Sequence, residues 1–208
     1  MTALRHQFLW FDLETTCLDP RADNARILEW ALVLADDDGP EATFEPVQSF
    51  TSAVHWPDAV PAPLTPGGTP MAGGALRASC DSVVSLMHAN NGLWEEVADP
   101  ATKPLAASED FLVAVATDLA PRGGLRLAGY SVHYDLEWAW VHLPRFAALL
   151  SHHVMNVSTL KSAACAWGPG YVHASPPAHR ALPDVRASLE DARELAALSR
   201  KGWANASN

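Results

Sequence analysis

Four acidic residues stand amid apolar residues or where a helical pattern begins. Asp12 and Glu14 lie two positions apart in the apolar run FLWFDLE, and Asp135 and Asp184 come near the starts of two helical patterns. In a strand, a spacing of two places both carboxylates on one face. Such a pair repels unless a cation or a proton relieves it. The pair therefore predicts a metal site, whereas Asp135 and Asp184 taken singly also fit helix caps.

The elements that must position these acids alternate between strands and helices. Apolar patterning predicts strands over 8–14, 27–35, 43–51 and 125–130, and a short extended segment around Val157. It predicts helices over 107–119, 132–142 and 146–150, and an amphipathic helix from Leu182 to Ala196 with Pro183 in its first turn. A meander of three strands, followed by a strand and a helix, indicates an α/β or α+β sheet.

The composition is that of a globular protein. The 208 residues, 49% hydrophobic and 18% charged, can bury a full core. We expect a single domain over 1–208, with the Pro/Gly-rich stretch 56–79 as a loop insertion. No apolar run approaches the roughly 20 residues needed to span a bilayer, and Gln7 leaves no room for a signal peptide. We therefore expect a cytoplasmic protein with no membrane partner.

The net charge bears on the partners of the protein, and the cysteine spacing bears on the state of its thiols. The net charge of -10 disfavours sequence-independent adhesion to long polyanions, because that attraction rests on many phosphate contacts. A short anionic substrate held by metal ions is compatible with it. Cys17, Cys80 and Cys165 lack the paired spacing of a disulfide framework or a zinc site, which predicts free, buried thiols.

Three motifs resemble those of the DEDDh 3'-5' exonucleases. They are DLETTCLDP (12–20), GYSVHYD (129–135) and HRALPD (179–184). Within that superfamily NVSTLKSAACAW (156–167), HLPRF (142–146) and HANNGLWEEV (88–97) resemble segments of the oligoribonuclease branch. The resemblance implies an RNase H-like fold of the α/β class, a mixed sheet flanked by helices. It also implies two Mg²⁺ or Mn²⁺ ions held by Asp12, Glu14, Asp135 and Asp184, with His179 as the general base.

The same resemblance suggests substrate-binding residues. Ser131, Ser158 and Thr159 match the positions of a phosphate cap, and Leu18 and His88 match positions that contact bases and phosphate. The chain departs from the family at several positions. His152 and His153 replace a Tyr-Arg pair, Val83 replaces a tryptophan wedge, and Thr15, Cys17 and Asn156 replace Met, Gly and Asp. Of the tryptophans, Trp56 and Trp94 are candidate substitutes for the wedge, and Trp30, Trp138, Trp140 and Trp167 are expected in the core.

These observations lead to one main hypothesis with two alternatives. The main hypothesis is a metal-dependent exoribonuclease that hydrolyses short single-stranded RNA to nucleoside 5'-monophosphates. One alternative is an exonuclease on single-stranded DNA or of mixed specificity, which Thr15 and the altered phosphate cap favour. The other is a catalytically silent nucleotide-binding module. By resemblance we also expect a homodimer in which His152 lies near the partner's active site.

Overall fold

One mixed sheet organises the protein. The computed structural model describes residues 8–37, 39, 42–59, 75–119, 124–167 and 178–206. The strands are β1 (Phe8–Thr15), β2 (Ile27–Ala35), β3 (Pro46–Ala53), β4 (Arg126–Gly129) and β5 (Met155–Asn156), in the order β3-β2-β1-β4-β5. The central strand β1 pairs antiparallel with β2 and parallel with β4. This confirms the expected RNase H-like sheet.

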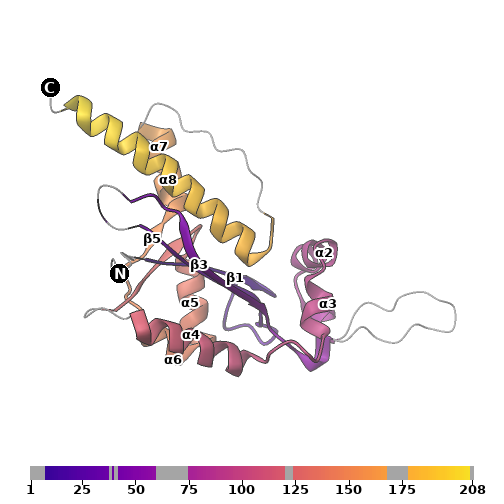
Figure 1. The fold of residues 1–208 in the computed structure, drawn as a ribbon. Coiled ribbons are helices and arrows are strands. Elements are labelled where there is room, and N and C mark those ends of the chain that lie inside the picture. The colour runs from indigo at the N-terminus through magenta and orange to yellow at the C-terminus, as the bar shows by residue number, and fades with distance from the viewer. Residues whose placement is uncertain are drawn as a thin grey trace.

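Helices cover both faces of the sheet and one end of it. They are α1 (Ala75–Ser79), α2 (Ser82–Asn90), α3 (Leu93–Ala98), α4 (Leu105–Leu119), α5 (His133–His142), α6 (Pro144–Ala147), α7 (Val157–Trp167) and α8 (Ala181–Ala206). In Figure 1 the long α8 crosses one face, α4, α5 and α6 lie on the other, and α2 and α3 stand at one end. None of the described helices is long and apolar enough to cross a membrane.

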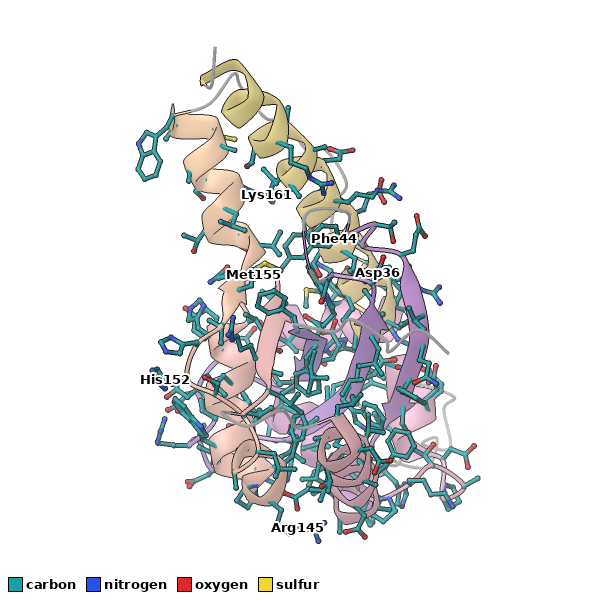
Figure 2. All side chains as sticks on the ribbon, turned by 60° about the vertical axis from the view of Figure 1, so that its left-hand side comes forward. Asp36, Phe44, Arg145, His152, Met155 and Lys161 are labelled. Carbon is teal, nitrogen blue, oxygen red and sulfur yellow. The ribbon has the colours of Figure 1, made fainter. Side chains whose placement is uncertain are left out.

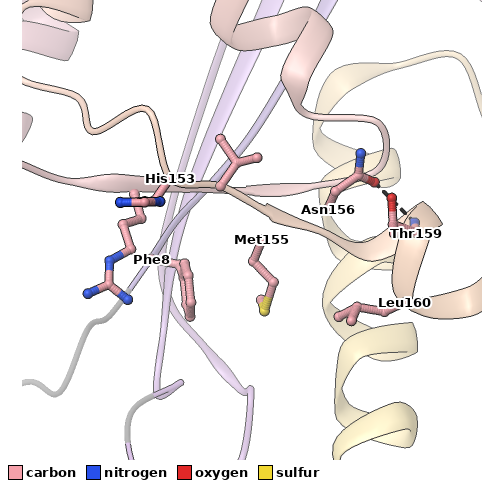
Figure 3. Close-up of a pocket in the computed structure, with 8 residues that line it drawn as sticks. Phe8, His153, Met155, Asn156, Thr159 and Leu160 are labelled. Atoms are coloured by element: carbon pink, nitrogen blue, oxygen red, sulfur yellow. Dashed lines mark hydrogen bonds between the residues drawn. The ribbon is translucent and has the colours of Figure 1, made fainter. Parts of the chain in front are cut away.

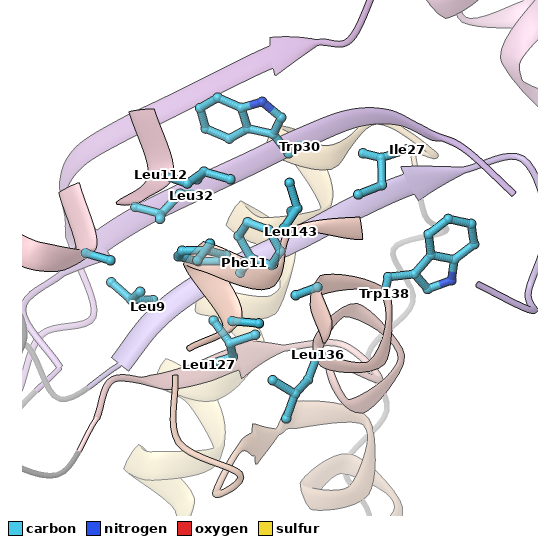
Figure 4. Packing of buried hydrophobic residues seen from close by; sticks show 14 of the residues in the cluster. Leu9, Phe11, Ile27, Trp30, Leu32, Leu112, Leu127, Leu136, Trp138 and Leu143 are labelled. Atoms are coloured by element: carbon cyan, nitrogen blue, oxygen red, sulfur yellow. The ribbon is translucent and has the colours of Figure 1, made fainter. Parts of the chain in front are cut away.

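The alternation of β1 divides the core in two. Leu9 and Phe11 face α4, α5 and α6, in the cluster drawn in Figure 4. Trp10, one residue between them, faces α8 and packs with Val185 and Leu189. All nine residues of β2 are buried, as expected for a strand covered on both faces. The strand that carries Asp12 and Glu14 is therefore held from both sides.

Several details differ from the sequence-based predictions. Trp30 and Trp138 are buried as predicted, but Trp140 and Trp167 are 54% and 87% exposed. Trp140 lies beside the buried stripe of α5 on its solvent side. Trp167 ends α7, a helix in which only Val157 is buried. Cys165 is exposed on the same helix, so the prediction that it is buried is wrong. Cys17 and Cys80 are partly buried, and the structure shows no disulfide among the described cysteines.

Element boundaries also shift. The third strand begins at Pro46 rather than Thr43, after Phe44 adopts a left-handed backbone with φ of 59°. Val157 begins α7, and the extended segment before it is Met155–Asn156. Of the predicted loop over 56–79, Pro57–Ala59 forms a 3-10 turn and 75–79 forms α1. Residues 60–74 lie outside the described residues.

Candidate active site

Three of the predicted carboxylates meet at the junction of β1 and α8. One oxygen from each of Asp12, Glu14 and Asp184 lies within 4.8 Å of the others. The strand supplies two of them because its side chains alternate, which puts Asp12 and Glu14 on the face that α8 covers. Asp184 comes from the first turn of α8. The arrangement predicted from the spacing of the strand acids is therefore present, and α8 adds a third carboxylate.

The fourth predicted acid, Asp135, sits beside this group but is not within it. Asp135 is in the first turn of α5 and is buried. Its Oδ1 accepts a hydrogen bond from the backbone N–H of Leu13, at 2.8 Å. This bond fixes Asp135 to β1 at Leu13, the residue between Asp12 and Glu14 in the sequence. The negative charge of Asp135 also raises the pKa of Asp12, so the two carboxyls are electrostatic neighbours.

Burial and mutual repulsion make these carboxylates costly to ionise. Burial, followed by the charge of Asp135, raises the pKa of Asp12 well above its usual range. Burial, followed by the charge of Asp184, raises the pKa of Glu14 to about 8. Burial also raises the pKa of Asp135 to about 7, against the opposing effect of its backbone hydrogen bond. A divalent cation would favour the ionised forms, and an all-oxygen donor set suits a hard cation.

The predicted general base lies on a short segment tied to the acidic cluster. The backbone N–H of Ala178 donates to Asp184 Oδ1 at 2.8 Å. The next residue, His179, has φ of 53° in the left-handed region. Its carbonyl accepts a hydrogen bond from the side-chain amide of Asn91, which follows α2. The segment that carries His179 is thus fixed both to a metal-ligand candidate and to the helices at the end of the sheet.

His88 lies inside the protein next to the acids. It is fully buried in α2, and its Nε2 is 3.6 Å from Glu14 Oε2. Neither ring nitrogen has a hydrogen-bond partner among the described residues. Burial lowers the pKa of His88 to about 4, so the ring is neutral near pH 7. Its predicted contact with substrate phosphate stays a prediction.

A cleft of about 150 Å³ opens beside the carboxylates. Its lining includes Asp12, Asp135, Leu18, Ser131 and Tyr134. Leu18 is 79% exposed, which leaves an apolar surface free at the mouth of the cleft. Ser131 joins Ser158 through two contacts, with Ser158 Oγ 3.1 Å from the Ser131 N–H and 3.3 Å from its hydroxyl. The structure therefore brings together Leu18, Ser131 and Ser158 of the predicted substrate residues.

The other predicted substrate residues lie outside this cleft. Thr159 and His153 line a separate, open pocket of about 610 Å³ along β5 (Figure 3). In that pocket the Thr159 N–H donates to Asn156 Oδ1 at 3.3 Å. His152 projects at the surface (Figure 2), and its ring lies against the ring of His153 with centroids 3.9 Å apart. Both histidines lie in the loop between α6 and β5.

Neither candidate replacement for the tryptophan wedge offers a free aromatic face. Trp94 is buried, and its Nε1 donates to the carbonyl of Ser85 at 3.1 Å. Trp56 is half-buried, its Nε1 donates to the carbonyl of Ile27 at 2.8 Å, and the Arg26 guanidinium lies over its ring, 5.2 Å from the centroid. Val83, which stands at the wedge position, is 66% exposed. An aromatic residue that the sequence analysis missed is Tyr134, which lines the carboxylate cleft and is 48% exposed.

Comparison of the sequence with known proteins identifies the family to which the chain belongs. An oligoribonuclease of Thiobacillus denitrificans is 30% identical over 187 residues, which cover 89% of this chain and 90% of the relative. The chain belongs to the oligoribonuclease family. Oligoribonucleases of Pseudomonas aeruginosa and Bordetella pertussis are each 27% identical, over 187 and 195 residues. These alignments cover 89% and 92% of this chain and 91% and 94% of the relatives. No protein-family model matches the chain.

Solved structures agree on the fold of this oligoribonuclease family member. A structure of exonuclease I superposes with a TM-score of 0.60 at 15% identity, over 95% of this chain and 42% of that one. The complex of Escherichia coli exonuclease I with a dT13 oligonucleotide gives a TM-score of 0.59 at 14% identity, over 97% of this chain and 43% of that one. The chain thus spans less than half the length of exonuclease I. At such identity the likeness concerns the fold alone.

Proposed function

We propose that this protein is a metal-dependent 3'-5' exoribonuclease that hydrolyses short oligoribonucleotides to nucleoside 5'-monophosphates. The observation that carries the proposal is the meeting of Asp12, Glu14 and Asp184 within 4.8 Å of one another, in a chain of the oligoribonuclease family. A silent binding module would have no need of buried carboxylates whose ionisation is this costly. The family relation and the cluster together favour catalysis over simple binding.

The four acids are the residues that would hold Mg²⁺ or Mn²⁺, and we propose two ions. Asp12, Glu14 and Asp184 already converge, and Asp135 stands beside Asp12. When bound, such ions supply Lewis-acid activation of the attacking water and charge stabilisation for the leaving 3' oxygen. The burial that raises the pKa values of Asp12 and Glu14 also weakens solvent competition for the ions.

The remaining chemistry falls to the residues of the chain. The oxygen of a water molecule bonds to the phosphorus of the terminal linkage, and the bond from that phosphorus to the 3' oxygen of the preceding nucleotide breaks. His179 accepts the proton that the water loses, as an imidazole general base can, and the departing 3' oxygen takes up a proton from solvent. The paired hydroxyls of Ser131 and Ser158 suit a phosphate group, and Leu18 and Tyr134 offer surfaces on which bases can pack.

We further propose a homodimer and a cytoplasmic location. His152 and His153 are exposed at one edge of the protomer, away from the carboxylate cleft that Leu18 and Ser131 line. In the proposed dimer this edge of one chain packs against the carboxylate cleft of the second copy, which places His152 near the partner's substrate. Light scattering at micromolar concentration tests this. A species of 22.4 kDa alone, the mass of one chain, would overturn the dimer.

The activity is tested with matched substrates. RNA and DNA of two, five and twenty residues are incubated with Mg²⁺, with Mn²⁺ and with EDTA, and products are resolved by mass. We expect nucleoside 5'-monophosphates from short RNA, no product in EDTA, and none from Asp184→Asn. Faster cleavage of matched DNA would replace the proposal with a DNA or mixed exonuclease. Metal-dependent binding without products would indicate the silent module.

A further inference from the structure

The segment that carries His179 is held by a network that no catalytic role explains. Arg180, the next residue, directs its guanidinium at two acids on different elements. Its Nε and Nη2 lie 3.0 and 2.9 Å from the carboxylate oxygens of Glu29 on β2. Its Nη2 also lies 2.9 and 3.0 Å from the two oxygens of Glu96 on α3. Arg180 thereby joins the segment to the sheet and to the helices at its end.

Glu29 completes the attachment from the side of the sheet. It is an acid in an otherwise apolar, fully buried strand, and it pairs with Glu14 across β1 and β2. Besides Arg180, it accepts a hydrogen bond from the backbone N–H of Ala181 at 2.9 Å. A buried carboxylate with an arginine fork and an amide donor has its ionised form well satisfied. The start of α8 is therefore fixed to β2.

Asn91 and residues 179–180 exchange hydrogen bonds in both directions. Asn91 Nδ2 donates to the His179 carbonyl at 2.5 Å, and Arg180 Nη1 donates to the Asn91 carbonyl at 3.2 Å. Asn91 Oδ1 meanwhile accepts a hydrogen bond from the N–H of Leu93, the first residue of α3, at 3.1 Å. Each polar group of the Asn91 side chain thus has a separate partner. Only its NH₂ group reaches His179.

The backbone of His179 needs such support. Left-handed φ values are disfavoured for residues with a Cβ and persist where surrounding contacts determine them. His179 has φ of 53°, and hydrogen bonds hold the chain on both sides of it. The Ala178 N–H before it donates to Asp184, and its own carbonyl accepts from Asn91. Released from these contacts, the segment would relax toward commoner conformations. The imidazole would then move with the backbone.

We propose that Asn91 and Arg180 are positioning residues that hold the His179 backbone in its left-handed conformation and so place the general base. This proposal rests on the proposed nuclease function. Asn91 acts through its hydrogen bond to the His179 carbonyl. Arg180 acts through its hydrogen bonds to Glu29, Glu96 and Asn91. Neither residue is assigned a contact with substrate or metal. Because a misplacement of about 1 Å at a reacting group can cost roughly 10²-fold in rate, loss of the support should appear in kcat.

Asn91→Asp is the sharpest test. The variant keeps the oxygen that accepts from the Leu93 N–H and replaces only the NH₂ group with a second acceptor, which repels the His179 carbonyl. Asn90→Asp is the matched control, since Asn90 is the exposed neighbouring residue and the substitution adds the same charge. We expect Asn91→Asp to lower kcat about tenfold or more with KM within about twofold, and Asn90→Asp to behave as the wild type.

Two further measurements separate positioning from stability and from metal binding. In metal-free protein, hydrogen exchange at the Ala178 amide should speed up in Asn91→Asp and not in Asn90→Asp. The rise of the thermal midpoint on adding Mg²⁺ should equal that of the wild type in both variants. Arg180→Lys, which keeps the charge but loses the fork, should lower kcat in the same direction.

The proposal is overturned if folded Asn91→Asp retains the wild-type kcat, or if kcat falls only in proportion to the unfolded fraction. A loss of the Mg²⁺ response in Asn91→Asp would also overturn it, since the residue would then act on the metal site. Failure of the nuclease function gives a different result. The wild type would then cleave no oligonucleotide, while exchange at Ala178 would still report whether Asn91 holds the segment.

Discussion

The Nε2 atom of His88 lies 3.6 Å from Oε2 of Glu14, although no solvent reaches the histidine side chain. A hydrophobic wall closes the other side, where the ring meets Trp94 edge to face with centroids 6.2 Å apart. Burial favours the neutral imidazole, and the raised pKa of Glu14, about 8, favours the protonated carboxyl. In metal-free protein at neutral pH the two therefore meet as largely uncharged groups.

The burial of His88 predicts that the free energy of unfolding falls in acid. The folded protein binds a proton at His88 with a pKa of about 4, and the unfolded chain binds it near 6.5. Stability from His88 is therefore present above pH 6.5 and is lost as pH falls toward 4. We expect the free energy of unfolding of His88→Gln, relative to wild type, to improve steadily on acidification below pH 6.5. Chemical denaturation at several pH values measures it, and a constant difference would contradict the burial argument.

The acidic cluster predicts the opposite slope at higher pH. Glu14 and Asp135 have folded-state pKa values of about 8 and 7, above their ordinary values of 4.5 and 3.8. Stability from these groups is present at low pH and is lost as pH rises through 7 and 8. Above pH 6.5 the His88 effect is complete, so metal-free protein should lose stability between about pH 6.5 and 8. Thermal unfolding in EDTA should show this fall, and Mg²⁺ should reverse it.

Removing one carboxylate should separate activity from stability. Asp12→Asn relieves repulsion but deletes a proposed metal ligand. We expect its thermal midpoint in EDTA to exceed that of wild type, its Mg²⁺ response to be lost, and turnover to fall about 10²-fold or more. Asp23→Asn, at an exposed position, serves as the control. Turnover of Asp12→Asn within a few fold of wild type would remove Asp12 from the site.

Tyr134 should influence substrate affinity. Its ring is half-exposed at the carboxylate cleft and lies against His133 with centroids 4.2 Å apart. Loss of a stacked base contact costs roughly 1 to 3 kcal/mol, so Tyr134→Ala should raise KM for a dinucleotide about 5- to 150-fold. The KM of Tyr134→Phe should stay near that of wild type. So should the KM of Trp140→Ala, because Trp140 is an exposed aromatic residue on the same helix that does not line the cleft. Equal effects of Tyr134→Ala and Trp140→Ala would argue against stacking at the cleft.

The parts of the site that follow local periodicity were predictable from the sequence. The two-residue spacing of Asp12 and Glu14 gives one face of a strand whatever the rest of the chain does, and the period of α8 places Asp184 in its first turn. Glu29 carried a readable signal that was missed. An acid in the middle of an apolar strand requires a buried partner, and that partner is Arg180.

Contacts between distant segments were not predictable in this way. Asn91 and His179 are 88 positions apart, and no pattern near either residue indicates their hydrogen bond. The exposure of Trp167 has a similar origin. Composition favours burial of tryptophan, but the direction in which α7 leaves the sheet decides the outcome. Tyr134 was missed because its exposure depends on how the turn before α5 meets β1.

The acidic cluster joins the first strand to the last helix that the structure describes. About 170 positions separate Asp12 and Glu14 from Asp184 in the sequence, so the cluster forms only when β1 and α8 have packed together. A partly folded chain in which α8 has not docked holds two of the three carboxylates close together and lacks the third. The proposed metal binding should therefore appear only when this long-range contact is complete.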